Sequence, residues 1–233
     1  MYSFELPYFD ERNAKINMIV IHCLAHNVQS AIDAFHRHRV SAHYLIDEKG
    51  KIYHLVADHK RAWHAGESFW QGQTSLNHNS IGIELCSPSL GQEPYPMRQI
   101  SALIRLCKHL KRKYHIKKQN ILGHSDIAPA RKADPGKAFP WAYLARHNLG
   151  VWYNLKNAKK VALENPAELL QKIGYDTSNI SASLWAFMRH FTADCIPTDT
   201  IENLLSNPYP DTLKTDDMRL KQTLRAVFFE IQK

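Results

Sequence analysis

Short apolar runs and helical patterns alternate along the first 150 residues of the chain. Segment 16–23 is an apolar run rich in β-branched residues, which is typical of a buried strand, and segments 80–87 and 120–126 contain similar runs. Two apolar runs flank a DEKG turn within 42–56, so this segment predicts a β-hairpin in which Gly50 relieves the backbone. We therefore expect a sheet built from these strands.

Two helices are predicted between the strands. Apolar residues recur at helical spacing over 97–114, and a pair of prolines marks the start of this long helix. A shorter helix over 30–40 has Ser30 as its expected N-terminal cap. Alternating strands and helices indicate an α/β (α+β) domain, with a mixed central β-sheet flanked by helices. We place this domain at residues 1–155.

The strand pattern stops after about residue 155. Four later segments have apolar residues at helical spacing, and they are 167–176, 181–191, 199–207 and 220–231. Short helices of this kind bury their apolar faces against one another. We therefore expect a second, small all-helical bundle domain at residues 160–233.

The net charge of +8 belongs entirely to the first 150 residues. They carry 20 Lys and Arg against 12 Asp and Glu, and 13 of the 14 His, whereas residues 151–233 carry ten basic and ten acidic residues. A basic surface favours anionic partners. The densest run of cations, 108–118, falls on the predicted long helix. We interpret its lysines mainly as the solvent-exposed face of that helix, with a polyanion-binding patch as the alternative.

Three common signals are missing from the sequence. No stretch approaches the ~20 consecutive apolar residues of a membrane-spanning helix, so no transmembrane segment is expected. The first residues lack the basic start and apolar stretch of a signal peptide. The four cysteines include no CxxC pair, which argues against a zinc site made of cysteines.

Two histidines and an aspartate give the strongest chemical signal. His22 ends one apolar run and His124 follows another, and Asp134 lies ten residues later on a loop with prolines. A catalytic zinc takes three protein ligands from His, Asp, Glu or Cys and leaves a fourth position for water. We therefore predict that these three residues bind one zinc ion. Taken singly, each histidine also fits a hydrogen-bonded strand end, and Asp134 fits a turn.

Two further charged residues fit a hydrolytic site. Lys132 lies on the same loop as Asp134, where its ammonium would stabilise negative charge on a carbonyl oxygen. Glu84 is a carboxylate inside an apolar strand, and burying its charge is costly without a partner. Such a glutamate would act as general acid and base beside a zinc-activated water. An edge-strand glutamate facing solvent is the alternative.

Five separated motifs carry a family resemblance. VIHC, SAHYLI, RAWHAG, LNHNSIGIEL and GHSDIAPARKADPGKAFPW lie between about residues 15 and 145. In sequence and order they resemble the motifs of the zinc-dependent N-acetylmuramoyl-L-alanine amidases of the type-2 (AmpD/AmiD-like) family, which is related in fold to peptidoglycan recognition proteins. The chain most resembles the AmiD branch, because LLQKIGYD and LWAFMRHF fit a helical peptidoglycan-binding module.

The resemblance implies an enzyme and assigns roles in it. His22, His124 and Asp134 become the zinc ligands, Glu84 the catalytic carboxylate, and Lys132 the group that stabilises the tetrahedral intermediate. The implied reaction is hydrolysis of the amide bond between the lactyl group of N-acetylmuramic acid and L-alanine of the stem peptide.

The resemblance also implies a substrate cleft and a place of action. We expect Trp63, His64 and Asn77 to contact peptidoglycan or a muropeptide. The family favours the periplasm or cell envelope of a bacterium, whereas the lack of a signal peptide keeps the cytoplasm open. A monomer is favoured.

Three other functions are weighed against the amidase. A recognition protein that binds peptidoglycan without cutting it has no need of Glu84 and Lys132. A nucleic-acid binder would be expected to have a basic C-terminal part, but that part is neutral, so no nucleic-acid partner is expected. A cytoplasmic amidase restricted to recycling anhydro-muropeptides needs no wall-binding module. The preference between anhydro-muropeptides and intact peptidoglycan is left open.

Overall fold

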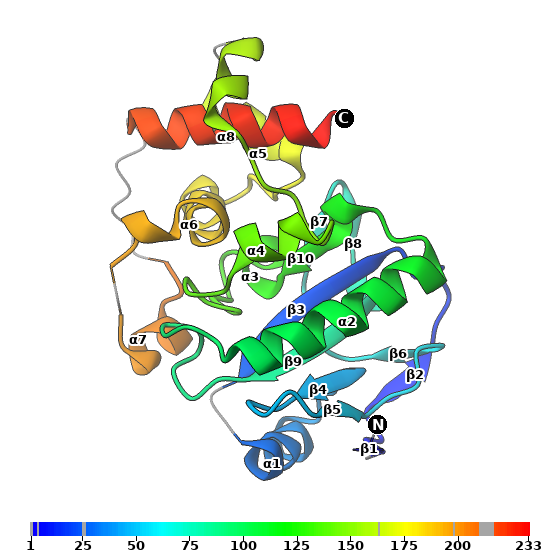
Figure 1. The fold of residues 1–233 in the computed structure, drawn as a ribbon. Coiled ribbons are helices and arrows are strands. Elements are labelled where there is room, and N and C mark those ends of the chain that lie inside the picture. Colours follow the sequence, from blue (N-terminus) through cyan, green and yellow to red (C-terminus); the bar gives the residue numbers. More distant parts are fainter. Residues whose placement is uncertain (1, 4, 25–26, 163, 198, 210–216) are drawn as a thin grey trace.

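A six-stranded mixed sheet forms the centre of the protein (Figure 1). The computed structural model describes residues 2–3, 5–24, 27–162, 164–197, 199–209 and 217–233. The strands are, in spatial order, β1 (Tyr2–Ser3), β5 (Ile52–His54), β4 (Tyr44–Ile46), β9 (Ser80–Cys86), β3 (Met18–Leu24) and β10 (Ile121–Gly123). The β4–β5 pair is antiparallel and the other pairs are parallel. The predicted hairpin and the predicted mixed sheet are therefore both confirmed.

Two antiparallel ribbons stand beside this sheet. β2 (Phe9–Glu11) pairs with β6 (Lys60–Ala62), and β7 (Phe69–Trp70) pairs with β8 (Gln73–Thr74). Four short 3-10 turns are also present among the described residues, at Leu76–His78, Lys118–Asn120, Leu155–Lys160 and Ala193–Cys195.

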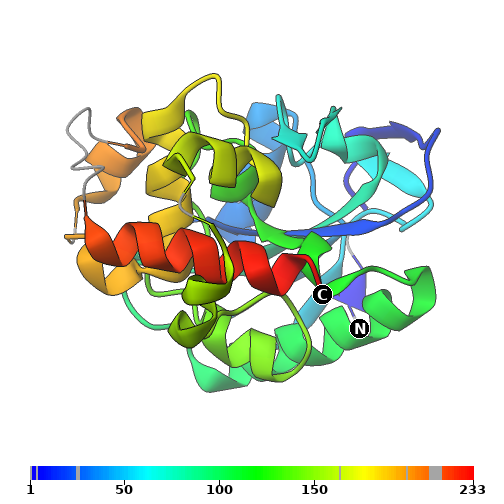
Figure 2. The same cartoon turned by 90° about the horizontal axis from the view of Figure 1, so that it is seen from above.

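Helices α1 (Val28–His38) and α2 (Met97–Tyr114) lie on opposite sides of the sheet (Figure 2). The apolar stripe of α2 packs against alternate strand residues, in a cluster that includes Ile21, Ile83 and Leu103. The buried residues of α1 pack with the intervening residues, such as Leu45.

The predicted start of the first helix is wrong by a few residues. α1 begins at Val28, and the side chain of Asn27 accepts a hydrogen bond of 3.0 Å from the Ser30 N–H. Asparagine caps a helix as well as serine does. The Asn27 side chain therefore takes the role that was assigned to Ser30.

The helices at residues 166–173, 180–191 and 218–231 lie on the β10 side of the sheet, whereas the helix at residues 201–206 lies apart from them (Figure 1). After α3 (His124–Ile127) and α4 (Trp141–Arg146) come α5 (Pro166–Ile173), α6 (Ile180–Phe191), α7 (Ile201–Ser206) and α8 (Met218–Ile231), each within or close to a predicted helical segment. One apolar cluster contains Val20 and Leu122 of the strands together with Leu170, Phe187 and Leu224 of the helices. This cluster therefore spans both parts of the chain, and the division into domains at 1–155 and 160–233 stays a prediction.

Parallel strands bring the predicted site residues to one edge of the sheet. The register of β3 and β9 places His22 opposite Glu84, and β10 pairs Gly123 with Ile21. His124 follows Gly123 directly and begins α3. The carboxyl ends of three neighbouring strands thus present these residues together.

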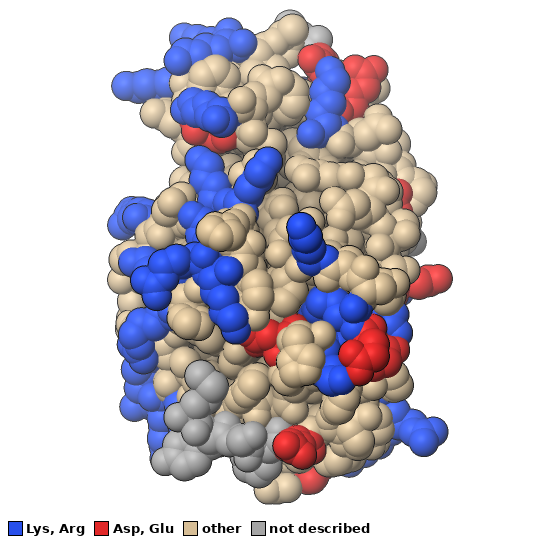
Figure 3. Space-filling model, turned by 90° about the vertical axis from the view of Figure 1, so that its right-hand side faces the viewer, with Lys and Arg blue, Asp and Glu red and all other residues tan. Residues whose placement is uncertain are grey.

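Lys and Arg gather along one side of the molecule (Figure 3). Five cations of the dense run on α2 and the turn after it line a shallow surface cavity with no acidic residue in its lining, and they are Lys108, Lys111, Arg112, Lys117 and Lys118. Polyanion binding at this cavity stays a prediction. None of the described helices combines the length and the apolar composition needed to cross a bilayer.

Candidate metal centre and active site

Three side-chain atoms meet at the carboxyl edge of the sheet. His22 Nδ1 lies 2.9 Å from His124 Nδ1 and 3.5 Å from Asp134 Oδ2, and His124 Nδ1 lies 3.2 Å from the same oxygen. A tetrahedral zinc site with ligand bonds of about 2.0–2.1 Å separates its ligand atoms by about 3.3 Å. The three predicted ligands therefore already form a triangle of the size that zinc requires.

The second ring nitrogen of each histidine has a partner of its own. His22 Nε2 lies 3.0 Å from His64 Nδ1, and His64 Nε2 lies 3.1 Å from Ser80 Oγ. His124 Nε2 lies 3.3 Å from the carbonyl oxygen of Ala65. Such outer contacts fix the tautomer and the orientation of a metal-binding imidazole. Both Nδ1 atoms are thus left to face the metal position.

The loop from His124 to Asp134 doubles back on itself. The Ser125 N–H donates to the carbonyl oxygen of Asp134 at 2.9 Å, so the two ends of the loop are tied together. The Tyr95 hydroxyl donates to the carbonyl oxygen of Pro135 at 2.7 Å. Hydrogen bonds to the backbone therefore hold the Asp134 carboxylate beside the two imidazoles.

The electrostatics of this cluster favour a cation. Burial and the neighbouring His124 lower the pKa of His22 to about 4. Burial alone would raise the pKa of Asp134, but His124 and His22 hold that pKa well below its usual value. At neutral pH His22 is neutral and Asp134 is ionised, and these are the forms that bind a metal.

Glu84 lies across the ladder from His22 and lines the same cavity as His124 and Asp134. Burial raises the pKa of Glu84 well above its usual value, Asp134 raises it further, and Lys132 lowers it. Its Oε2 atom is buried and has no hydrogen-bond partner among the described residues. A buried carboxylate oxygen without a partner suits a group that exchanges protons with a ligand.

The cavity above these residues has a volume of about 700 Å³. Its lining includes the predicted substrate contacts Trp63, His64 and Asn77, together with Lys132. The side chain of Asn77 accepts hydrogen bonds from the N–H groups of His64 and Ala65, at 3.0 and 2.8 Å. Both ring nitrogens of His64 are engaged as described above, which leaves its ring carbons for contact with a substrate. Direct binding of substrate by these residues stays a prediction.

A model of the N-acetylmuramoyl-L-alanine amidase family (Amidase_2) matches residues 12–137, more than half of the chain. This range contains all three ligand candidates, Glu84 and Lys132. The chain belongs to this amidase family.

Curated relatives of the amidase support the assignment. The N-acetylmuramoyl-L-alanine amidase AmiD of Escherichia coli is 39% identical over 186 residues, which cover 70% of this chain and 67% of that protein. The 1,6-anhydro-N-acetylmuramyl-L-alanine amidase AmpD of Escherichia coli is 47% identical over 105 residues, which cover 45% of this chain and 56% of that protein. The match to AmpD is thus shorter than the match to AmiD.

Solved structures resemble the amidase over almost its whole length. A complex of Escherichia coli AmiD with anhydro-N-acetylmuramic acid-L-Ala-D-γ-Glu-L-Lys superposes with a TM-score of 0.75 at 31% identity, covering 94% of this chain and 92% of the other. AmpDh3 of Pseudomonas aeruginosa superposes with a TM-score of 0.77 at 28% identity, covering 94% of both chains. The shared fold therefore extends beyond the segment that the family model matches.

The amidase also uses residues that the motif analysis did not single out. Gly82 lies directly behind His64, and a Cβ atom there would come within 2.4 Å of the His64 ring. Only glycine fits this strand position, because the ring that contacts His22 occupies the space of a side chain. A glycine inside the apolar run SIGIEL was the available signal for such a close approach.

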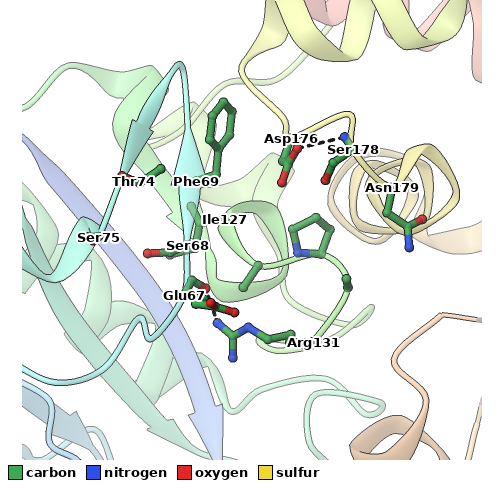
Figure 4. Close-up of a pocket in the computed structure, with 13 residues that line it drawn as sticks. Glu67, Ser68, Phe69, Thr74, Ser75, Ile127, Arg131, Asp176, Ser178 and Asn179 are labelled. Atoms are coloured by element: carbon green, nitrogen blue, oxygen red, sulfur yellow. Dashed lines mark hydrogen bonds between the residues drawn. The ribbon is translucent and has the colours of Figure 1, made fainter.

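A second cavity of about 450 Å³ lies next to the active site of the amidase (Figure 4). It is lined by residues 67–69 and 74–75, by residues 127–131 in the middle of the loop from His124 to Asp134, and by Asp176, Ser178 and Asn179 of the C-terminal part. Arg131 lines both cavities and donates hydrogen bonds to the carbonyl oxygens of Ala65 and Glu67. The loop from His124 to Asp134 therefore shares the lining of this second cavity with residues of the C-terminal part of the chain.

Proposed function

We propose that this chain is a zinc-dependent amidase that hydrolyses the bond between the lactyl group of N-acetylmuramic acid and L-alanine of the stem peptide. The observation that carries the proposal is the triangle of His22, His124 and Asp134, with the buried and unpartnered Oε2 atom of Glu84 in the same cavity lining. Family membership supplies the reaction class. The geometry supplies a role for each side chain.

The donor set suits a single zinc ion. Two imidazoles and one carboxylate are ligands typical of catalytic zinc, and their spacing matches a tetrahedral ion with one position left over. A bound zinc ion would polarise the scissile carbonyl group and lower the pKa of a water molecule to about 7. One zinc ion per chain is expected.

Glu84 is the group that transfers a proton from the attacking water to the leaving amine. Its raised pKa suits a group that accepts a proton from the attacking water and then delivers it to the amide nitrogen. The water oxygen bonds to the carbonyl carbon, the carbon–nitrogen bond breaks, and the proton leaves with the amine of L-alanine. The products are a free muramic carboxylate and a free stem peptide.

Lys132 compensates the negative charge that develops on the carbonyl oxygen. Its ammonium acts at the same cavity and lowers the pKa of Glu84, so its field reaches the reacting groups. We expect Lys132→Ala to lower kcat by about 10²-fold, because charge stabilisation of this kind contributes about 10²–10³-fold. Steady-state rates on a muropeptide measure this loss.

A matched control is Lys49→Ala, which removes an exposed lysine from the turn between β4 and β5, outside the cavities described above. Its rates should equal those of the unmodified chain. Equal rates for Lys132→Ala and Lys49→Ala would remove Lys132 from the mechanism.

Anhydro-muropeptides are the substrates we infer first. The AmiD and AmpDh3 structures include complexes with anhydromuramyl peptides, and both folds cover nearly all of this chain. A protein that binds peptidoglycan without hydrolysing it is less well supported, because Glu84 and Lys132 have no evident use in such a protein. We also infer action at the bacterial cell envelope as a monomer, on peptidoglycan or on fragments of it.

Mass spectrometry of digests tests the proposal. Zinc-loaded protein is incubated with purified anhydro-muropeptides and, separately, with intact sacculi. Peptides that begin with L-alanine and sugars that have lost their peptide are expected from the first substrate, and the second arm measures whether the polymer is also cut. Anhydro-muropeptides and sacculi that both remain intact would overturn the amidase assignment.

A further inference from the structure

A buried carboxylate lies one half-turn beyond the ligand His124. Asp126 is only 1% exposed, and α3 places it two residues after His124. Three groups donate hydrogen bonds to it: the Tyr175 hydroxyl at 2.6 Å, His190 Nδ1 at 2.8 Å and the Gly123 N–H at 2.7 Å. A buried charge persists only when its hydrogen-bonding capacity is met in this way.

Two of the three donors come from the C-terminal part of the chain. Tyr175 directly follows Gly174, the residue that ends α5, and His190 lies in α6. The His190 ring is stacked between Trp141 and Phe191, with ring centroids 3.9 and 4.1 Å away. This sandwich fixes the direction of its Nδ1 atom. Burial raises the pKa of Tyr175 well above its usual value, and Asp126 raises it further, so its hydroxyl stays a donor.

The third donor connects Asp126 to the metal ligands. Gly123 is the last residue of β10, and its N–H is held by the Asp126 carboxylate immediately before His124 leaves the strand. Ser125 lies between His124 and Asp126, and its N–H donates a hydrogen bond to the carbonyl oxygen of Asp134. The turn at residues 123–126, which the Asp126 carboxylate stabilises, therefore sets the positions of His124 and Asp134.

We infer that Tyr175 and His190 are positioning residues for the metal centre, acting on His124 and Asp134 through the Asp126 carboxylate. The C-terminal helices are then part of the active-site framework in addition to any role in holding the cell wall. This inference rests on the proposed zinc-dependent function. Capping of α3 accounts for the hydrogen bond from Gly123 alone, whereas Tyr175 and His190 add two donors from the C-terminal part of the chain.

Zinc affinity of the full chain is the primary test. Tyr175→Phe removes one oxygen atom, and His190→Ala removes the imidazole. Each is expected to weaken zinc binding by about 10-fold, the lower end of the 10–100-fold that follows loss of a direct partner of a metal ligand, because both act one contact further away. At saturating zinc, kcat should fall and KM should change less than twofold, because neither residue lines the active-site cavity. Competition with a chromophoric chelator gives the affinity.

Two matched variants separate positioning from general loosening. His190→Asn keeps a donor nitrogen at the same number of bonds from Cα as His190 Nδ1, so it should restore zinc affinity to within about threefold. Tyr153→Phe removes another tyrosine hydroxyl of this core, which donates to the carbonyl oxygen of Phe191 and not to Asp126. Its zinc affinity should be unchanged.

The zinc affinities of these variants either support or overturn the inference. Wild-type zinc affinity in Tyr175→Phe and His190→Ala would overturn the inference, and so would an equal loss in Tyr153→Phe. Imidazole NMR signals of the metal-free chain give a second readout: those of His124 should shift in Tyr175→Phe, whereas those of His54 should not. Unmoved His124 signals overturn the inference whether or not zinc binds. Failure of the unmodified chain to bind zinc would instead count against the proposed function.

Discussion

Glu84→Gln is expected to bind zinc as the unmodified chain does and to lose about 10²–10⁴-fold in kcat. The amide has nearly the shape of the carboxylate, and Glu84 is not one of the three ligand candidates, so the metal position is preserved. Glutamine cannot take up and return a proton, and general acid–base catalysis contributes a factor of this size. Zinc content by elemental analysis and steady-state rates on an anhydro-muropeptide check the two halves of the result.

The control for this variant is Glu93→Gln, which changes an exposed carboxylate outside the cavity. It should match the unmodified chain in zinc content and in rate. A Glu84→Gln protein that retains full turnover would assign the proton transfer to another group, and loss of its zinc would point to direct coordination by Glu84.

His124→Ala is expected to lose stoichiometric zinc and activity together. Two of the three protein ligands then remain, and the alanine has no group that replaces the imidazole. In the unmodified chain, zinc at 100 times its Kd stabilises the fold by about 2.7 kcal/mol. For a chain of this size that corresponds to a rise in Tm of roughly 5–11 °C. The rise should vanish in His124→Ala.

Thermal unfolding with and without zinc, after removal of metal by a chelator, measures this difference. His109→Ala is the matched control, since His109 is an exposed histidine of α2 outside the site. The control should keep the full zinc-dependent rise. An undiminished rise in His124→Ala would mean that zinc binds elsewhere.

The sequence predicted the sheet and the ligands because both depend on local patterns. Apolar runs locate β3, β9 and β10, and polar residues at their carboxyl ends must meet wherever such strands are parallel neighbours. His22, Glu84 and His124 are examples of this rule. Asp134 required more, since it lies ten residues after His124 on a loop with prolines and reaches the same edge only if this loop folds back.

The contacts around the ligands were not predictable in this way. Nothing near Tyr175 or His190 in the sequence marks them as partners of Asp126, which lies 49 and 64 residues away. His64 and Asn77 were assigned to the substrate from their motif, yet their polar groups contact other parts of the site. Such pairings are decided by tertiary packing, which periodicity along one segment does not report.

The dependence of Asp126 on residues late in the chain has a consequence for biosynthesis. Translation proceeds at about 5–20 residues per second, so the 56 residues from 135 to 190 take roughly 3–11 s to add. During that interval the last ligand exists, but the Asp126 carboxylate still lacks its imidazole donor. On the inference above, a nascent chain therefore gains the imidazole donor of Asp126 only seconds after its last metal ligand has been added.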